Sequence, residues 1–255
     1  MTERIVSVDR ALDVLLALYH NNGEMGVSEL ARELDLHKST IHRSLASLEF
    51  KGFVQKNPEN GKYWLGMKIY AMGLLVGEKF SLADVVRPYA KALFDAFGEV
   101  VNVSVLDRDP HEGYKSVIIL KEASSSKVLS VNPGVGTSSD LHISSIGKSL
   151  LAFSKEIDLM AYAEQPLRRY TENTIVSWEG MMTELRKIRQ QGYAIDNEEQ
   201  EIGLYCIGAP ILDKKGNAIA AISISGPTVR MKGPDLEEKI KKVVEISRRI
   251  TQEAL

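Results

Sequence analysis

Three short amphipathic stretches follow one another within the first fifty residues, and their spacing constrains the fold more than any other feature of this sequence. Apolar side chains recur at positions i, i+3, i+4 and i+7 in residues 11–18 and again in residues 27–34, which is the pattern of a helix with one buried face. Asn21–Gly23 ends the first helix, and Ser28 is the expected N-terminal cap of the second. Asp35–Leu36 forms the turn that follows.

The third stretch begins near Lys38 and predicts a helix with a distinctive outer face. Ile41, Leu45 and Leu48 share one side of this helix, so at 100° per residue the opposite side carries small, polar and cationic residues. These are Ser39, Arg43, Ala46 and Ser47, with Thr40 and His42 at the flanks. Two short helices, a tight turn and a third helix of this kind form a helix-turn-helix, in which the third helix enters the major groove of DNA.

The expected DNA contacts follow from the chemistry of these side chains. Arg43 is the candidate for a bidentate guanine contact, because a guanidinium fork matches the two acceptors of that base. Lys38, Ser39 and Thr40 stand at the helix N-terminus, where hydroxyl, N–H and ammonium groups suit phosphate oxygens. For His42 three roles stay open: contact with a base, contact with the DNA backbone, or packing on the flank of the helix.

Two short β-like runs, residues 53–56 and 62–65, follow the third helix and are separated by Asn57–Gly61, whose Asn-Gly pair favours a hairpin. In this position a hairpin forms the wing of a winged helix-turn-helix domain, which we place at residues 1–66. Lys56 and Lys62 flank the tip of the hairpin and are expected to contact a phosphate or the minor groove. A three-helix bundle whose hairpin contacts another protein is the alternative.

Charge is distributed unevenly over this module. Residues 1–36 carry three basic and seven acidic side chains, whereas residues 37–68 carry six basic and two acidic ones. The formal net charge of the whole chain is −2, which excludes a uniformly basic nucleic-acid coat but not a single cationic face. A DNA-binding domain that contacts phosphates with one face has this asymmetry of charge, and so does a protein surface covered by salt bridges.

The rest of the composition indicates a soluble globular protein, and we expect it in the cytoplasm. With 255 residues, 44% of them hydrophobic and 26% charged, the chain suits one large or two modest domains and excludes long disorder or a rod. No apolar run approaches the roughly 18 residues of a membrane helix, and no apolar stretch follows the N-terminus as in a secretory signal. Cys206 is the only cysteine, so an internal disulfide is excluded.

A linker helix and a second domain follow the hairpin. Residues 67–81 predict a helix that links two domains, and residues 82–255 predict a mixed α/β or α+β domain used for effector binding and oligomerisation. Its β-like runs and its helical stretches alternate; they are residues 100–106, 114–120, 128–131, 146–153, 179–191 and 235–254.

Two further features of the second domain favour a ligand site. Ser223 and Ser225 lie on one face of a predicted strand because side chains alternate with period two, and Cys206 lies on the partner strand, across Asp213–Asn217. These hydroxyls either line a polar ligand or bond to backbone. Ser144–Lys148 starts a helix whose free N–H groups form an anion site. A small carboxylate is therefore the expected ligand.

Five blocks of the sequence resemble the IclR family of bacterial transcriptional regulators. They are Val8–Leu15, Lys38–Arg43, Tyr63–Gly66, Gly192–Asp196 and Ala220–Pro227. The resemblance spans almost the whole chain and implies an α+β protein: a winged helix-turn-helix domain, a linker helix and a C-terminal effector domain similar to GAF-type ligand-binding folds. It also implies a homodimer or tetramer, double-stranded operator DNA as a partner, and a small-molecule effector, frequently an oxo-acid, a sugar acid or an aromatic acid.

The resemblance also implies the residues of the effector site. Carried over to this chain, they are two backbone positions and four side chains: Ser145, Ile146, Asp196, Cys206, Ser223 and Ser225. Ser145 and Ile146 stand where smaller Gly or Ala residues are common in the family, which predicts a narrower pocket. Asp35 replaces a frequent Gly in the helix-turn-helix turn, where Asp still tolerates a left-handed conformation.

Three alternatives stay open. Cys206, His142 and Asp196 are the ingredients of a nucleophile, a base and an orienting group, as a Cys206-dependent hydrolase requires. The same trio offers ligand atoms for zinc, although it lacks a close-spaced ligand pair. A DNA-binding protein whose C-terminal domain only oligomerises is the third alternative. The expectation is a regulator that is not an enzyme and carries no cofactor or metal.

Overall fold

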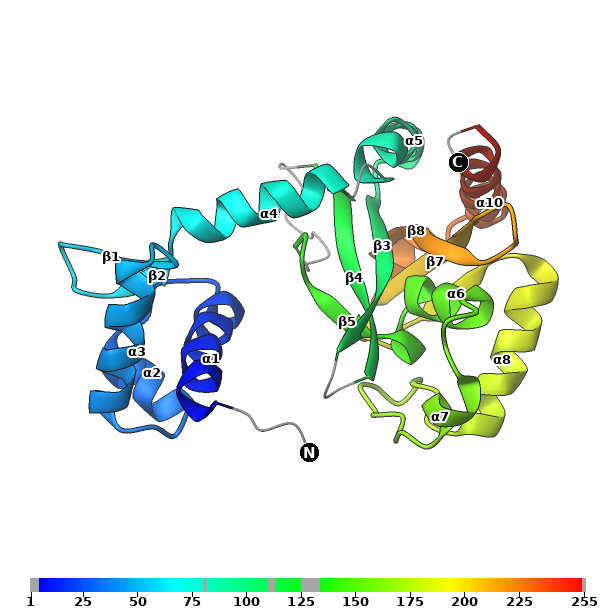
Figure 1. Ribbon diagram of the computed structural model, residues 1–255. Coiled ribbons are helices and arrows are strands. Elements are labelled where there is room, and N and C mark those ends of the chain that lie inside the picture. Colours follow the sequence, from blue (N-terminus) through cyan, green and yellow to red (C-terminus); the bar gives the residue numbers. More distant parts are fainter. Residues whose placement is uncertain (1–4, 80–81, 110–112, 125–133, 254–255) are drawn as a thin grey trace. The chain divides into compact units, whose positions relative to one another are not determined.

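The N-terminal part of the chain forms a small helical unit with a two-stranded hairpin, and the remainder forms a larger unit around one sheet (Figure 1). The computed structural model describes residues 5–79, 82–109, 113–124 and 134–253. The division between the two units falls between Ser81 and Leu82.

The N-terminal unit packs three helices and a hairpin around one core. Its elements are α1 Val6–Asn21, α2 Val27–Glu33, α3 Lys38–Phe50, β1 Val54–Lys56, β2 Tyr63–Leu65 and α4 Met67–Lys79. The three apolar stripes meet in this core, where Leu18, Leu30 and Leu45 are completely buried. The hairpin strands pair antiparallel. The predicted winged helix-turn-helix is thereby confirmed.

Two details of this unit differ from the sequence prediction. Helix α1 begins at Val6, well before Ala11. The sequence pattern missed its first turn because the apolar side chains there are exposed and form no buried stripe. The prediction of Ser28 as the cap of α2 is wrong. Gly26 occupies the cap position, and its N–H donates to Glu29 Oε2 at 2.6 Å. The carboxylate of the first turn therefore reaches back to the N–H of the cap residue, and no serine side chain caps the helix.

The C-terminal unit is built on one antiparallel sheet with the strand order β5-β4-β3-β8-β7-β6. Its strands are β3 Val100–Asp109, β4 Gly113–Glu122, β5 Ser138–Asp140, β6 Ala194–Asn197, β7 Leu204–Leu212 and β8 Ala218–Pro227. The register places Asn102 opposite Ser223 and Cys206 opposite Ser225. Polar side chains of three adjacent strands are therefore brought to one place on the sheet.

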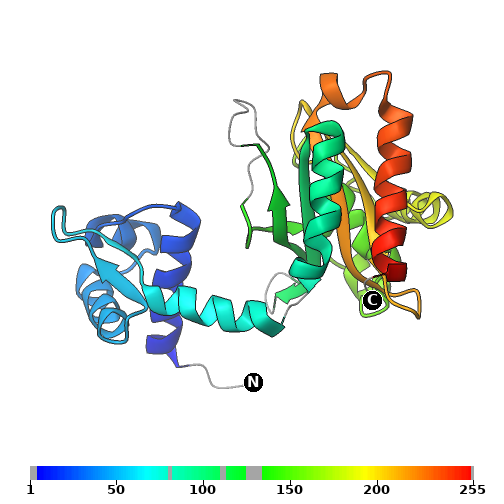
Figure 2. The same ribbon diagram turned by 90° about the horizontal axis from the view of Figure 1, so that it is seen from above.

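Helices cover both faces of this sheet. Helices α5 Leu82–Phe97 and α10 Leu236–Glu253 lie side by side on one face (Figure 2). Helices α6 Ser145–Phe153 and α8 Trp178–Gln191 pack on the other. Because side chains alternate along a strand, Ile222 packs with α5 and α10, while Ser223 faces α6. This α+β architecture is the expected fold class.

The predicted elements of this unit are largely confirmed. The runs at residues 100–106 and 114–120 are strands β3 and β4, and the three helical stretches are α6, α8 and α10. The run at residues 128–131 lies outside the described residues. The short strands β5 and β6 were not predicted; the remaining connections contain η1 Leu141–Ile143, α7 Leu159–Ala163 and α9 Thr228–Met231. Within the described ranges, every helix is too short or too polar to cross a membrane.

Candidate functional site

The outer face of α3 is the candidate DNA-reading surface. Ile41, Leu45 and Leu48 anchor the helix in the core, and this leaves the opposite side in solvent. Of the α3 residues predicted to contact DNA, four are exposed and Thr40 is half-buried; the exposed ones are Lys38, Ser39, His42 and Arg43. Asp35, in the turn before α3, has a φ of 50°, which is the left-handed conformation expected of the residue that replaces Gly.

The N-terminus of α3 carries free N–H donors. The carbonyl of His37 accepts from the N–H groups of Thr40 and Ile41, and no side chain caps the helix. In the described part of the unit, the N–H groups of Lys38 and Ser39 therefore have no protein acceptor. Such donors, together with the positive end of the helix dipole, suit a phosphate oxygen.

The two lysines of the wing have different surroundings. Lys62 Nζ lies 3.0 Å from Glu29 Oε1 of α2, so its charge is already paired within the unit. Lys56 is exposed, and its ammonium group lies over the ring of Tyr63, 5.6 Å from the ring centroid. The loop between the strands is fixed by Asn57 and Asn60, which both donate to Glu24. Lys56 is therefore the wing lysine whose charge is directed to solvent.

A cavity of about 70 Å³ lies between the sheet and the start of α6 in the C-terminal unit. Five of the six predicted effector residues line it, and Asp196 does not. The described lining residues are Asn102, Ser104, Ser116, Ile118, Ser139, Ser144, Ser145, Ile146, Gln200, Glu201, Leu204, Cys206, Ser223 and Ser225. Asn102 and Ser104 were not predicted, although their alternation with the apolar Val101 and Val103 on β3 carries the same signal as Ser223 and Ser225.

The N-terminus of α6 forms one wall of this cavity. Ser144 caps the helix, with its Oγ accepting from Gly147 N at 3.0 Å and its carbonyl accepting from Lys148 N at 2.9 Å. The N–H groups of Ser145 and Ile146 have no acceptor among the described residues. Both residues line the cavity, so the helix presents two unsatisfied donors and its positive dipole end to whatever fills the space.

Two glycines allow α6 to sit this close to its neighbours. A Cβ atom on Gly147 would lie 2.3 Å from the Leu141 carbonyl oxygen, and a Cβ on Gly208 of β7 would lie 2.9 Å from the Ser145 carbonyl carbon. Both contacts are with backbone, which has little freedom to move away. The position of the α6 N-terminus over the sheet therefore depends on the absence of these two side chains.

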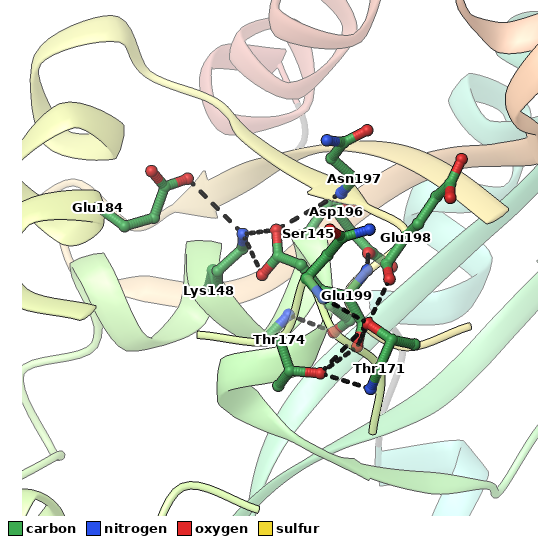
Figure 3. Close-up of polar contacts among 12 residues, drawn as sticks. Ser145, Lys148, Thr171, Thr174, Glu184, Asp196, Asn197, Glu198 and Glu199 are labelled. Atoms are coloured by element: carbon green, nitrogen blue, oxygen red, sulfur yellow. Dashed lines mark hydrogen bonds and ion pairs between the residues drawn. The ribbon is translucent and has the colours of Figure 1, made fainter. Parts of the chain in front are cut away.

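A completely buried lysine lies one turn into α6. Lys148 Nζ contacts both carboxylate oxygens of Glu199, at 2.6 and 2.8 Å, and approaches Glu184 at 3.6 Å (Figure 3). The backbone that carries Glu199 is held by two hydroxyls, with Thr171 Oγ1 donating to the Glu198 carbonyl and Thr174 Oγ1 to the Glu199 carbonyl. Burial raises the pKa of Glu199, and the ammonium group of Lys148 opposes that rise.

Asp196 lies behind the cavity wall, opposite Cys206 in the pairing of β6 with β7. Its Oδ1 accepts from Glu199 N at 2.8 Å, while its buried Oδ2 has no hydrogen-bond partner in the described structure. Burial raises the pKa of Asp196 to about 7. Burial also raises the pKa of the Cys206 thiol, and the nearby charge of Asp196 adds to the rise. Cys206 is thus a neutral thiol rather than an activated nucleophile.

His142 does not join Asp196 and Cys206. Its ring Nε2 lies 2.9 Å from the Arg168 carbonyl oxygen, and burial lowers its pKa. In the ranges that the structure describes, no three His, Cys, Asp or Glu side chains are placed to hold one metal ion. The geometry therefore gives no support to the hydrolase or to the zinc alternative that the sequence left open.

Comparison with known protein families agrees with both units. The family described as "IclR helix-turn-helix domain" matches residues 7–58, and "Bacterial transcriptional regulator IclR C-terminal" matches residues 76–252. The chain belongs to the IclR family. The resemblance inferred from the five sequence blocks is thereby confirmed, and the IclR-type regulators that this chain resembles are transcription factors rather than enzymes.

Individual relatives match over nearly the full length. HTH-type transcriptional regulator BhcR of Paracoccus denitrificans is 34% identical over 97% of this chain and 86% of that protein. The crystal structure of Thermotoga maritima IclR superposes with a TM-score of 0.77 at 31% identity, covering 98% of this chain and 99% of that one. An IclR homologue from Microbacterium hydrocarbonoxydans, solved as a complex with 4-hydroxybenzoate, has the same fold, with a TM-score of 0.81 at 22% identity over 96% of this chain and 97% of its own.

Proposed function

We propose that this IclR-family regulator binds a pseudo-palindromic operator as a homo-oligomer and is controlled by a small carboxylate in the cavity of its C-terminal unit. The observation that carries the proposal is the pair of N–H groups on Ser145 and Ile146, which have no described acceptor and lie at a cavity wall. Donors at a helix N-terminus bind anions. The carboxylate accepts from these groups, and Ser223 and Ser225 supply hydroxyls to the rest of the ligand.

The DNA contacts are proposed for the outer face of α3 and for the wing. Arg43 reads a guanine, His42 lies where it reaches a neighbouring base or phosphate, and Lys38, Ser39 and Thr40 hold phosphate oxygens at the helix N-terminus. Lys56 adds a phosphate contact from the wing. Lys62 is close enough to share this role, but only after it gives up its ion pair with Glu29.

Self-association is supported by two exposed apolar stripes in the N-terminal unit. Exposed apolar residues recur at helical spacing along both α1 and α4. They are Val8, Leu12, Leu16 and Tyr19 on α1, preceded by the cap residue Ile5, and Met67, Tyr70, Leu74 and Leu75 on α4. Large exposed apolar surfaces mark sites of association. A second copy of the chain that covers them gives the two reading heads that a pseudo-palindrome requires, because a single recognition helix reads only a few base pairs.

Control by the ligand follows from linkage. An acid alters operator affinity only if it binds the DNA-competent and the incompetent states with different affinity. Helix α4 joins the reading unit to the ligand-binding unit, and we propose that it transmits the difference. A regulator of this kind acts where its operator DNA lies, which in a bacterium is the cytoplasm.

The test is a competition experiment on the full-length protein. A labelled fragment from upstream of its own coding region is titrated with protein in the presence of bulk genomic DNA, with and without small carboxylates. A specific operator is expected to bind about a thousandfold or more tighter than bulk DNA at physiological salt. Equal affinity for the fragment and for bulk DNA under every condition overturns the proposal.

A thermal-shift screen separates this function from oligomerisation alone. A carboxylate at 100 times its dissociation constant stabilises the protein by about 2.7 kcal/mol. If no member of a broad acid library raises the melting temperature, the C-terminal unit is not an acid sensor, and the reading in which it only oligomerises gains support.

A further inference from the structure

The cavity is lined by hydrogen-bonding groups to a degree that an anion site alone does not explain. Seven of its described lining residues are serines, and Asn102 and Gln200 add two amides. The apolar part of the wall consists mainly of Ile118, Ile146 and Leu204. Two N–H donors at the start of α6 are enough for one carboxylate, so the remaining polar groups face other parts of the ligand.

Asn102 constrains the chemistry of the ligand more strongly than the other lining residues do. Its side chain is 5% exposed, and its Oδ1 is buried without a hydrogen-bond partner among the described residues. A buried amide oxygen that lacks a donor is costly to maintain in a folded protein. A carboxylate has only acceptors and cannot satisfy it. A hydroxyl group can, because it donates one hydrogen bond and still accepts others.

The neighbouring serine hydroxyls can donate to a ligand group or accept from it. The hydroxyls of Ser223 and Ser225 lie 3.4 Å apart, which is long for a hydrogen bond between hydroxyls. Ser223 stands directly opposite Asn102 in the pairing of β8 with β3. At the rim, the exposed carboxylate of Glu201 is a further acceptor. Two acceptors, Asn102 Oδ1 and Glu201, thus stand beside hydroxyls that donate or accept, and this combination favours a ligand group that does both, as a hydroxyl does.

The volume favours a compact ligand. A water molecule needs about 10–15 Å³ of cavity volume, so a cavity of about 70 Å³ holds the equivalent of roughly five to seven water molecules. This space suits a small aliphatic acid better than an aromatic one, and among small acids the hydroxy acids supply the donor that Asn102 lacks.

We infer that the ligand is a small aliphatic hydroxy acid, with its carboxylate at the N-terminus of α6 and its hydroxyl on Asn102 and Ser223. This inference rests on the proposed function, because it names the class of acid that the same cavity takes. Asn102 is then a residue that selects among acids: it discriminates a hydroxy acid from the acid that differs only in lacking the hydroxyl.

Two matched ligand pairs test the inference by isothermal titration of the full-length protein. Lactate and propionate differ by one hydroxyl, whereas lactate and lactamide differ by the charge of the carboxylate. We expect lactate to bind at least about tenfold tighter than propionate, since propionate leaves buried polar groups unpaired. We also expect lactate to bind at least about tenfold tighter than lactamide, because the helix N-terminus favours an anion.

The variant Asn102→Leu removes the amide while keeping the side-chain size. The preference for lactate over propionate is expected to fall below about threefold, with propionate binding retained. Asn173→Leu, at an exposed asparagine outside the cavity, is the matched control and should keep the wild-type preference. The comparison of the two acids on the unchanged protein remains decisive if Asn102→Leu does not fold.

The outcomes separate this inference from the proposed function. Equal binding of lactate and propionate, both tighter than lactamide, overturns the hydroxy-acid inference and leaves acid sensing intact. Tighter binding of 4-hydroxybenzoate than of any aliphatic hydroxy acid overturns the inference in the same way. Absence of binding by every carboxylate tested overturns the proposed function itself.

Discussion

Replacing Lys148 of α6 by methionine removes one partner of the buried ion pair with Glu199. Methionine keeps most of the lysine's length and apolar surface, so the main change is the loss of the ammonium group. Glu199, whose carboxylate lies 2.6 and 2.8 Å from that group, is then left buried without its cation. Glu184 is 3.6 Å away and more exposed, so it retains contact with solvent.

Breaking a buried pair in this way typically costs about 3–5 kcal/mol, because one charge remains in a medium of low polarity. For a unit of 150–250 residues, each kcal/mol lowers the melting temperature by about 2–4 °C, so the expected loss is about 6–20 °C. The penalty increases with pH. Burial already raises the pKa of Glu199, and without Lys148 its neutral form becomes the less costly one.

Differential scanning calorimetry of the full-length protein measures this loss. The double variant Lys148→Met with Glu199→Gln removes both charges and is expected to recover most of the stability that the single variant loses. Lys187→Met, at an exposed lysine of α8, is the control and should change stability by less than about 0.5 kcal/mol. A loss below about 1 kcal/mol for Lys148→Met, or a double variant less stable than the single one, refutes the role assigned to this pair.

Three further predictions concern the cavity and the DNA-reading surface. Burial raises the pKa of Asp196 from the ordinary aspartate value of about 3.9 to about 7, so this group makes the free energy of unfolding fall as pH rises between about 4 and 7. In urea titrations Asp196→Asn should remove part of that decline. If the free energy of unfolding of the variant depends on pH as steeply as that of the wild type, Asp196 does not have a raised pKa. Gly208→Ala places a Cβ 2.9 Å from Ser145; we expect a loss of about 1–3 kcal/mol and weaker acid binding, and retention of both properties argues against the close approach. Arg43→Ala should cost about 1–3 kcal/mol in operator binding and relax base preference. Lys56→Ala should weaken binding to all DNA sequences equally and lower the slope of log affinity against log salt concentration by about one. Equal loss on all sequences for Arg43→Ala refutes its base-reading role.

The winged helix-turn-helix could be predicted in detail because its signals are local. Buried positions such as Ile41 and Leu45 lie one turn apart in the sequence, and the hairpin is marked by Asn60 and Gly61. The cap of α2 was missed because residue type alone does not decide it. Ser28 and Glu29 are adjacent, and the choice between a serine cap and a carboxylate that reaches back to Gly26 depends on coordinates rather than on residue type.

The cavity was predicted in part. Ser223 and Ser225 were found because a strand alternates its side chains, and the same reasoning applied to β3 would have found Asn102. The ion pair of Lys148 and Glu199 was not accessible in this way, since the two residues are 51 positions apart. A lysine inside the apolar stretch of residues 145–153 indicates a buried charge, but the partner becomes known only when the sheet brings β6 beside α6.

We propose that an acid bound in the C-terminal cavity changes the affinity of α3 for its operator. The most direct test measures operator affinity by fluorescence anisotropy with and without a saturating acid, together with acid affinity with and without operator. A coupling of 1–3 kcal/mol changes operator affinity by about 5- to 150-fold, and reciprocity requires the same factor in the acid affinity. An acid that binds the cavity while operator affinity stays unchanged contradicts the account.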